Sequence, residues 1–339
     1  MATSLSENDR SESLTQERFT TKDAILKQFR EVLVGRELHI HVAHSPDPDD
    51  RLMFWPLAAG LVPSHVDQRP YLFSFEEADT QALNKLAQEE RADVCAVSAI
   101  HALRLMDRYQ PLRMGASVGD AYGPVVVALQ GGLGEQLFRS SFESCLEELH
   151  LLTPGETTTA HTVAQLVGLP FKTFEAVPIV PLTRVFEHLK RCEAQGRPTV
   201  ALLIHEGRLT YGEHGCVRLM DIGERWTEKT NSSLPLGLNV VSRKLSPQTR
   251  SDLSEIFVAS CRYSLTHREE FVRMARIPGH TYFSGLSSDK LRHYLDLYAN
   301  ETTVSILERD KRGFEELLAR ATQSGLLKLG TPLKEIDWV

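Results

Sequence analysis

The chain has 339 residues, of which 42% are hydrophobic and 24% charged, with 21 glycines and 16 prolines. These values are ordinary for a soluble globular protein and exclude a disordered chain, a fibrous repeat and a disulfide miniprotein. The formal net charge is −7, from 38 basic and 45 acidic residues, so no phosphate-neutralising basic face is indicated and we expect no nucleic-acid partner.

Five cysteines, odd in number and without a CxxC pair, predict buried thiols in a reducing compartment rather than a zinc site or a disulfide framework. The longest apolar runs, such as Val125–Leu129 and Val200–Ile204, are far too short to span a bilayer, so we expect no membrane partner. The polar N-terminus lacks the basic start and the apolar core of a secretory signal. A cytoplasmic location is therefore expected.

The first 35 residues are predicted to be an N-terminal extension that ends in an amphipathic helix over Thr21–Val34. Leu38–Ala43 alternates apolar and polar residues, which predicts a strand. The strand leads into Ser45–Asp50 (Ser-Pro-Asp-Pro-Asp-Asp), which is too rich in Pro and Asp to remain regular, and a helix is expected to follow over Leu52–Gly60.

The rest of the chain alternates strands and helices at lengths typical of α/β units with parallel strands. The predicted strands are Ala92–Val97, Leu112–Ser117, Val125–Ala128, Leu151–Thr153 and Val200–Ile204. The predicted helices are Thr80–Arg91, Ala99–Tyr109, Phe142–Leu149, Thr159–Val167, Val185–Gln195, Ser246–Glu269, Ser287–Ala299 and Lys311–Ser324.

Two α/β lobes, with the chain passing between them twice, fit this order of elements. We expect the crossings near Val125–Gln130 and Leu234–Val241. The first lobe then comprises residues 36–128 plus 236–339, and the second comprises residues 129–235. Such a hinge-and-cleft design places the ligand between the lobes, at strand ends and helix N-termini.

Polar segments follow the predicted strands, where an α/β protein collects its functional residues. In Ser45–Asp50, the acids Asp49 and Asp50 suit acid–base chemistry or a cation site, although capping is the most common role of Asp before a helix. Ser98 ends a strand, where its hydroxyl either caps the next helix or holds a ligand anion beside exposed amides.

Two further polar segments lie in the predicted second lobe. Pro154–Ala160 (Pro-Gly-Glu-Thr-Thr-Thr-Ala) offers hydroxyls and a helix N-terminus to a carboxylate or phosphate, with an ordinary turn and cap as the equal alternative. His205 follows the apolar run Ala201–Ile204 and is suited to exchange protons near neutral pH, although a lone histidine there is more often structural. Glu206 could orient it, but neighbours in an extended chain point to opposite faces.

In this order and spacing, these segments resemble the 1,4-dihydroxy-6-naphthoate synthases of menaquinone biosynthesis by the futalosine pathway, in the group that also contains chorismate dehydratase. The family pattern Ser-Pro-Cys-Pro-Asn-Asp-Thr stands here as residues 45–51, and Asp-Val-Ser-Lys-x-Ser stands as residues 93–98. Further matches are Gly115–Pro124, Pro154–Ala160, Ile204–Tyr211, Asp221–Trp226 and Leu234–Asn239. The stretch His-Glu-Gly-Arg-x-Thr-Tyr is the most specific part.

The resemblance implies an α/β fold of the type II periplasmic-binding-protein kind and a cytoplasmic enzyme acting on a small anionic organic substrate without metal or cofactor. The implied reaction opens cyclic dehypoxanthinyl futalosine. Deprotonation starts a carbon–carbon cleavage that aromatises the ring to 1,4-dihydroxy-6-naphthoate and releases a sugar-derived fragment. Because aromatisation supplies the driving force, a positioned base in a closed, dry cleft suffices for such chemistry.

The resemblance also implies the site residues, with His205 as the general base. The residues implied to bind the substrate from the two lobes are Ala96, Val97, Ser98, Thr158, Thr159, Ala160, Ser45 and Asp49. The pattern's Lys appears here as Ala96, and its Cys and Asn appear as Asp47 and Asp49, which adds negative charge where an anionic substrate is expected. A non-catalytic small-molecule binding protein, or a divergent paralogue with another ligand, is therefore the alternative.

Overall fold

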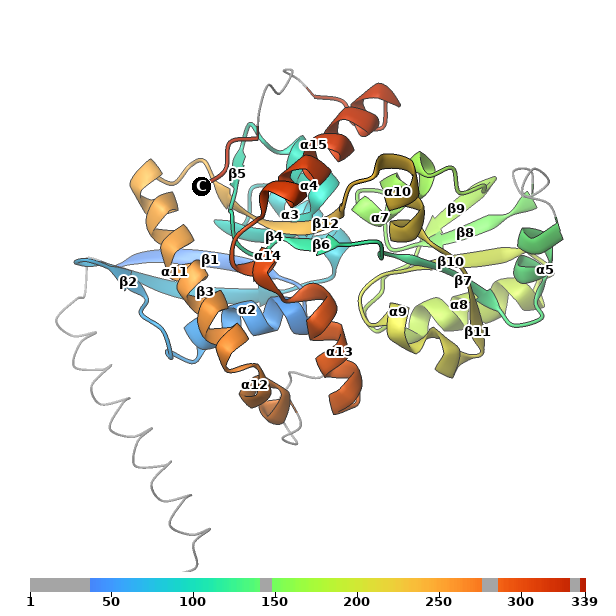
Figure 1. Cartoon of the computed structure of the whole chain (residues 1–339), viewed down its shortest axis with the longest axis horizontal. Helices are drawn as coiled ribbons and strands as arrows, with labels where there is room; N and C mark the ends of the chain where they lie inside the picture. Colours follow the sequence, from blue (N-terminus) through green and yellow to red (C-terminus); the bar gives the residue numbers. More distant parts are fainter. Residues whose placement is uncertain (1–36, 141–147, 276–285, 330–335) are drawn as a thin grey trace, which may run out of the picture.

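The computed structural model describes residues 37–140, 148–275, 286–329 and 336–339. Within them, two β-sheets lie side by side and each is covered by helices, which gives the two lobes of Figure 1. The helix predicted over Thr21–Val34, most of the helix predicted over Phe142–Leu149, and Cys145 lie outside the described residues.

The first sheet has the strand order β2-β3-β1-β4-β12-β5, with β6 also paired to β12. Its central strand β1 runs parallel to β3 and β4, whereas β12 returns from the second lobe and pairs antiparallel with β4. The strands are β1 (Leu38–His44), β2 (His65–Val66), β3 (Arg69–Glu77), β4 (Val94–Ser98), β5 (Tyr109–Pro111), β6 (Ser117–Gly119) and β12 (Leu234–Ser242). The helices of this lobe are α2 (Pro48–Ala58), α3 (Thr80–Gln88), α4 (Ala99–Arg104), α11 (Pro247–Thr266), α12 (Arg268–Met274), α13 (Ser288–Tyr298), α14 (Glu301–Val304) and α15 (Glu308–Gln323).

The second sheet has the order β11-β7-β10-β8-β9. Strands β8, β9 and β10 are mutually parallel, and β7 is antiparallel to β10 and β11. The strands are β7 (Val125–Leu129), β8 (His150–Thr153), β9 (Thr173–Ala176), β10 (Thr199–Leu203) and β11 (Cys216–Asp221). The helices of this lobe are α5 (Leu133–Ser140), α7 (Thr159–Leu166), α8 (Thr183–Ala194), α9 (Gly207–Thr210), the 3-10 turn η1 (Tyr211–His214) and α10 (Ile222–Thr230).

The predicted crossings between the sheets are wrong by a few residues. Strand β7 already pairs within the second sheet, so the chain leaves the first sheet between residues 119 and 125. It returns between the end of β11 at Asp221 and the start of β12 at Leu234. The segments expected to be crossings are therefore sheet strands, and their apolar composition reflects burial rather than passage between lobes.

Several predicted elements are confirmed at their cores, and others need correction. Helix α2 begins at Pro48, four residues earlier than predicted, because proline is tolerated in the first turn of a helix. The strand predicted over Leu112–Ser117 falls between β5 and β6, and the helix predicted over Ala99–Tyr109 ends at Arg104. Strand β3 was not predicted, because Arg-Pro-Tyr-Leu-Phe-Ser-Phe-Glu-Glu carries consecutive apolar residues rather than an alternation.

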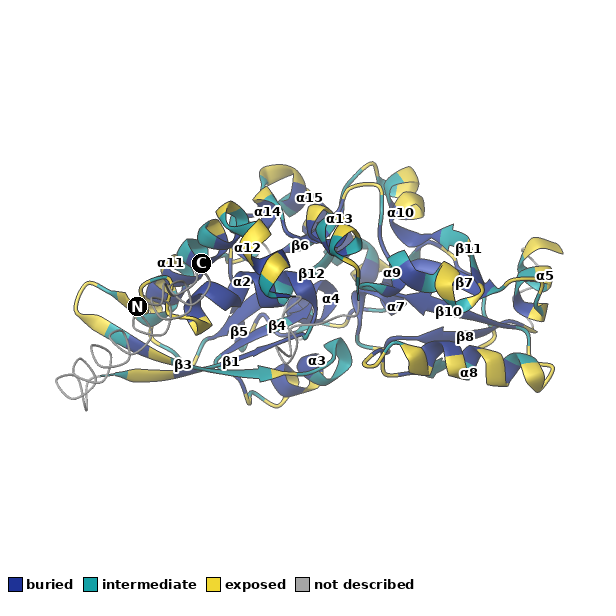
Figure 2. Ribbon diagram, turned by 90° about the horizontal axis from the view of Figure 1, so that it is seen from below, coloured by how far each residue is buried: buried dark blue, intermediate teal, exposed yellow. Residues whose placement is uncertain are grey.

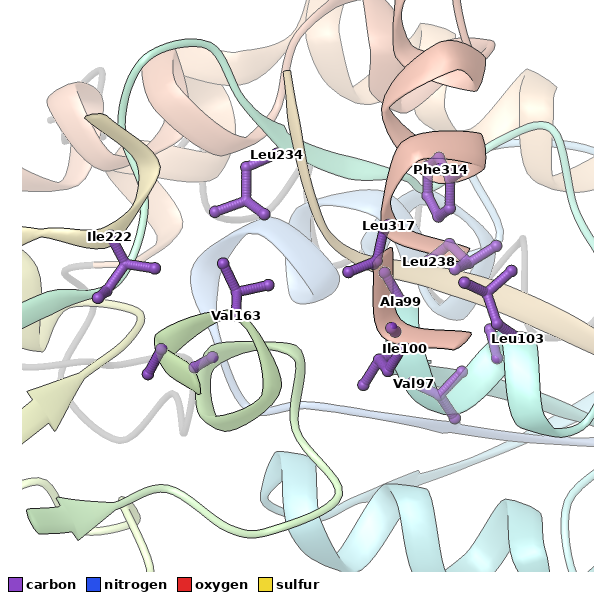
Figure 3. Packing of buried hydrophobic residues seen from close by; sticks show 14 of the residues in the cluster. Val97, Ala99, Ile100, Leu103, Val163, Ile222, Leu234, Leu238, Phe314 and Leu317 are labelled. Carbon is purple, nitrogen blue, oxygen red and sulfur yellow. The ribbon is translucent and has the colours of Figure 1, made fainter. Parts of the chain in front are cut away.

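One hydrophobic cluster continues from the first lobe into the second. It joins Val97 of β4 and Ile100 of α4 to Phe314 of α15, and it includes Val163 of α7 and Ile222 of α10 (Figure 3). In Figure 2 the central strands of the two sheets, such as β4 and β10, are buried while the outer face of α8 is exposed. Truncating a buried leucine to alanine in such a cluster lowers the free energy of unfolding by about 2–5 kcal/mol. Because this core is shared by both lobes, its packing stabilises the contact between them.

The four cysteines within the described residues (Cys95, Cys192, Cys216 and Cys261) are free and buried, as the sequence predicts. Among the helices of the described ranges, none combines the length and the apolarity required to cross a membrane.

Candidate functional site

A pocket lies where the two lobes meet, and every predicted site residue contributes to its lining. These residues are Ser45, Asp49, Ala96, Val97, Ser98, Thr158, Thr159, Ala160 and His205. They come from α2 and the loop before it, from the junction of β4 with α4, from the start of α7 and from the end of β10. The pocket is also lined by Asp50, Thr80, Leu83, Gly115, Ser117, Pro124, Ile204, Leu236, Gly237, Leu238, Tyr294 and Tyr298.

One side of the pocket, which we name the hydroxyl wall, consists of Ser98, Thr158, Thr159 and the first turn of α7. Thr158 is the N-cap of α7: its hydroxyl accepts the amide of His161 and donates to the carbonyl of Gly155 at 2.6 Å. Thr159 Oγ1 accepts the amide of Ile100 at 3.1 Å, so its own proton can be donated to a ligand. The first amides of a helix have no intrahelical acceptor, and this wall therefore offers donors to an anion.

Ser98 takes part in a polar network that joins the lobes. Its hydroxyl does not cap α4 but accepts a hydrogen bond from Asn84 Nδ2 at 3.1 Å. The same amide nitrogen donates to the carbonyl and the hydroxyl oxygen of Thr157 in the second lobe. Gly155, at φ +146°, permits this approach, because a Cβ there would lie 2.2 Å from the side chain of Gln81. The glycine of the Pro-Gly turn is thus required by the close contact of two lobes.

A second group, which we name the acidic wall, consists of Asp49, Asp50, His205 and Tyr294, which line the pocket, together with Asp47, which contacts His205 but does not itself line this pocket. Asp47 stands at the N-cap position of α2, yet its carboxylate caps nothing and lies 2.8 Å from His205 Nδ1. The other ring nitrogen, Nε2, lies 3.0 Å from Thr80 Oγ1. Tyr294 donates to Asp49 Oδ1 at 3.0 Å. From the sequence, Glu206 was considered as the residue that orients His205. In the structure Asp47 is the carboxylate that contacts the ring.

The backbone after β10 directs His205 into the pocket. His205 has φ +52°, a left-handed conformation that is uncommon outside glycine and is typically retained where the surroundings hold it. This turn takes the chain from β10 into α9. Arg208 of α9 then pairs with Asp221 and donates to the carbonyl of Gly123 at 2.6 Å, which ties the turn to the crossing segment. The Arg of the His-Glu-Gly-Arg motif therefore supports the turn that presents the histidine.

The acidic wall has strongly shifted acid–base properties. Burial lowers the pKa of His205, but the charge and hydrogen bond of Asp47, together with Asp49, outweigh it and raise the pKa to about 9. Burial and the neighbouring charges of Asp50 and Asp47 raise the pKa of Asp49 to about 7. For Asp47 itself, burial is outweighed by His205, and its pKa lies below the ordinary value. His205 and Asp47 therefore form an ion pair at neutral pH.

Sequence reasoning missed Thr80, Tyr294 and the pairing role of Asp47. Tyr294 lines the pocket from α13, 89 residues after His205. Tyr294 and Tyr298 are four residues apart in one helix, a spacing that is typical of ordinary core residues. Asp47 was singled out for its charge, but a charge count cannot show which side chain it faces. The sequence favoured a helix cap as the role of Asp49, whereas its carboxylate accepts a hydrogen bond from Tyr294.

Comparisons with known proteins show the family of the chain. A family profile described as menaquinone biosynthesis matches residues 40–323. A relative from Thermus thermophilus, named 1,4-dihydroxy-6-naphtoate synthase, is 31% identical over 287 residues, which cover 85% of this chain and 95% of the relative.

Solved structures agree with the two-lobed fold. A crystal structure of a protein from Archaeoglobus fulgidus aligns with a TM-score of 0.70 at 29% identity, covering 85% of this chain and 98% of that chain. A Candida albicans gene product, described as having the generic periplasmic binding protein structural fold, aligns with a TM-score of 0.55 at 11% identity, covering 84% and 94%. The predicted fold class is thereby confirmed, and at 11% identity the second likeness concerns the fold alone.

Proposed function

Because the chain belongs to the menaquinone-biosynthesis family of 1,4-dihydroxy-6-naphthoate synthases, we propose that it is a cytoplasmic carbon–carbon lyase that converts cyclic dehypoxanthinyl futalosine to 1,4-dihydroxy-6-naphthoate. The observation that carries the proposal is the convergence of all nine predicted site residues on one interlobe pocket, which His205 lines together with the hydroxyl wall.

The hydroxyl wall binds the carboxylate of the substrate in this proposal. The proton of Thr159 and the first amides of α7 donate to the carboxylate oxygens, and Ser98 approaches from the other lobe. None of these donors carries a charge that titrates. The family pattern's lysine is Ala96 here, so this chain binds the carboxylate through neutral donors alone at this end of β4.

His205 is the general base of the proposed reaction. Its Nε2 faces the pocket beside Thr80 and takes the proton whose removal starts the carbon–carbon cleavage. The electron pair of the broken C–H bond then forms a double bond of the ring. The electron pair of the breaking carbon–carbon bond leaves with the sugar-derived fragment, which takes up a proton, and the ring becomes aromatic. No electron acceptor is consumed in this step, and His205 leaves it as the imidazolium.

The experiment that tests the proposal is incubation of the purified full-length chain with cyclic dehypoxanthinyl futalosine, followed by absorbance spectroscopy and chromatography against authentic 1,4-dihydroxy-6-naphthoate. The expected result is time-dependent formation of the naphthoate chromophore. Saturable binding of the compound without any chromophore would contradict the lyase proposal and favour the alternative of a small-molecule binding protein.

A further inference from the structure

The first polar motif and the histidine after β10 meet across the two lobes through one short contact. Asp47 Oδ2 lies 2.8 Å from His205 Nδ1, and the Asp47 side chain is only 7% exposed. The family pattern has cysteine at this position, so the pairing is not part of what the resemblance implies. The contact is a feature of this chain's own residues.

The loop that carries Asp47 is fixed on both sides of it. The amide of Asp47 donates to Ser45 Oγ at 3.1 Å, and the amide of Ser45 donates to Asp50 Oδ2 at 2.8 Å. Pro46 and Pro48 flank Asp47 and restrict its backbone further. The Asp47 carboxylate makes no capping bond to α2; it lies against the imidazole and is also hydrogen-bonded to Ser45.

The contact determines which ring nitrogen is available for chemistry. A carboxylate accepts hydrogen bonds, so Nδ1 must carry the proton that it shares with Asp47. The neutral ring then has its lone pair on Nε2, the atom that lies 3.0 Å from Thr80 Oγ1 in the pocket wall.

We propose that Asp47 is a positioning residue for His205, whose carboxylate fixes the Nδ1-protonated tautomer and directs the basic Nε2 into the pocket. The inference rests on the proposed role of His205 as the base. It assigns to the substituted first motif a function in the chemistry, where charge alone suggested only repulsion of an anionic substrate.

The electrostatic surroundings of His205 set the pH at which such a base operates. Arg51 also acts on Asp47, but it is paired with Glu77. The groups that face the imidazole are Asp47, Asp49 and Asp50 from the start of α2, Tyr294 from α13, and Glu206 from its own segment. Since the pKa of His205 is about 9, the neutral base is the minor form at pH 7. Turnover should therefore rise with pH until about 9.

The direct test is NMR titration of the His205 ring in the ligand-free protein, assigned by the signal missing from His205→Asn. We expect a pKa of about 9 in the wild type and the Nδ1-protonated tautomer above it. Asp47→Asn should lower the pKa by about two units, as expected for losing an opposite charge in direct contact, and should mix the tautomers. Glu206→Gln is the matched control, because Glu206 acts on His205 through charge alone, and should shift the pKa by less than one unit.

Equal shifts in Asp47→Asn and Glu206→Gln, or no shift in either, would overturn the positioning role. If Asp47→Asn does not fold, Asp47→Cys, which restores the residue of the family pattern, is measured in its place and interpreted in the same way. The kinetic counterpart is the rising limb of kcat/KM against pH, which should move to lower pH in the variant while its plateau falls by roughly 10- to 100-fold. Absence of turnover in the wild type would contradict the proposed function alone, because the titration requires no turnover.

Discussion

The two walls of the pocket differ in the chemistry of the groups that form them. The hydroxyl wall offers backbone amides and Ser and Thr hydroxyls, whose hydrogen-bonding capacity does not change with pH. The acidic wall gathers three aspartates around one histidine and one tyrosine, and the pKa of His205 and that of Asp49 are both raised. Donors of the first kind are fixed by the start of a helix, while groups of the second kind depend on the protonation state of their neighbours.

This difference suggests that one wall binds the ligand and the other transfers protons. A wall of neutral donors can hold an anion with the same strength at any pH, so it is suited to binding. A wall of coupled titrating groups is suited to proton transfer. We also expect the repulsion among its buried carboxylates to lower the free energy of unfolding. The predictions below separate the two roles, since each wall should respond to a different measurement.

The largest expected effect concerns the acidic wall. His205→Asn keeps the size and polarity of the side chain but cannot take a proton, so turnover should fall by roughly 10²- to 10⁴-fold. Binding of 1,4-dihydroxy-6-naphthoate, measured by calorimetry, should stay within about twofold of the wild type because the hydroxyl wall is untouched. His188→Asn, on α8 and paired with Glu175 away from the pocket, is the control and should retain full turnover. Near-wild-type turnover in His205→Asn would remove this residue as the base.

The second prediction concerns the hydroxyl wall. Thr159→Val removes the donor hydroxyl and should raise the Kd for the naphthoate by about tenfold, the effect of losing about one charge-assisted hydrogen bond. The pKa of His205 should not move. Thr162→Val, which lies one turn along the same helix and does not line the pocket, should leave the Kd unchanged. An unchanged Kd in Thr159→Val would mean that the Thr run serves only to begin α7.

A third prediction tests whether the acidic wall also senses the ligand's charge. Asp49→Asn combined with Ala96→Lys restores both family-pattern residues at the pocket lining. If the native ligand is anionic, the affinity of the double variant for cyclic dehypoxanthinyl futalosine should exceed that of the wild type by roughly three- to tenfold at low ionic strength. The increase should be smaller at high salt, where exposed charges are screened. Weaker binding would indicate a neutral or cationic native ligand. Equal affinities at both salt concentrations would show that neither position senses the ligand.

The sequence predicted the hydroxyl wall better than the acidic wall, for a physical reason. Thr158, Thr159 and Ser98 stand at helix starts, and a helix start is encoded locally by a few neighbouring residues. The pairing of Asp47 with His205 joins residues 158 positions apart in two lobes, so only the tertiary fold determines it. The same holds for Tyr294 on α13.

The fold shows a similar limit. Strands with a clear apolar pattern, such as Leu38–His44 and Thr199–Leu203, were predicted within one or two residues. The lobe crossings were not, because β7 and β12 are apolar whether they lie within a sheet or between two sheets. The composition of a segment predicts that it is buried, whereas the pairing of the strands determines in which sheet it lies.

The smallest expected effect tests whether the acidic wall reduces stability. The folded-state pKa of Asp49, about 7, exceeds the unfolded value near 4, so the stability it contributes is present below pH 4 and is lost as pH rises through 7. Asp49→Asn mimics the protonated carboxyl and still accepts from Tyr294. Relative to the wild type, the variant should match it at pH 4 and gain on the order of 1 kcal/mol in free energy of unfolding at pH 8, measured by urea denaturation.

Asp252 provides the control of opposite sign for this last measurement. Its hydrogen bond from Arg69 lowers the pKa of Asp252 to about 2, so its stabilising contribution is present above the unfolded value and is lost only in acid. Asp252→Asn should therefore destabilise the protein at pH 8 and less so at low pH, the reverse of Asp49→Asn. Parallel pH dependence in both variants would mean that folding lowers the pKa of Asp49, and no pH dependence in Asp49→Asn would mean that folding leaves it unchanged. In either case the acidic wall would carry no stored electrostatic cost at that position.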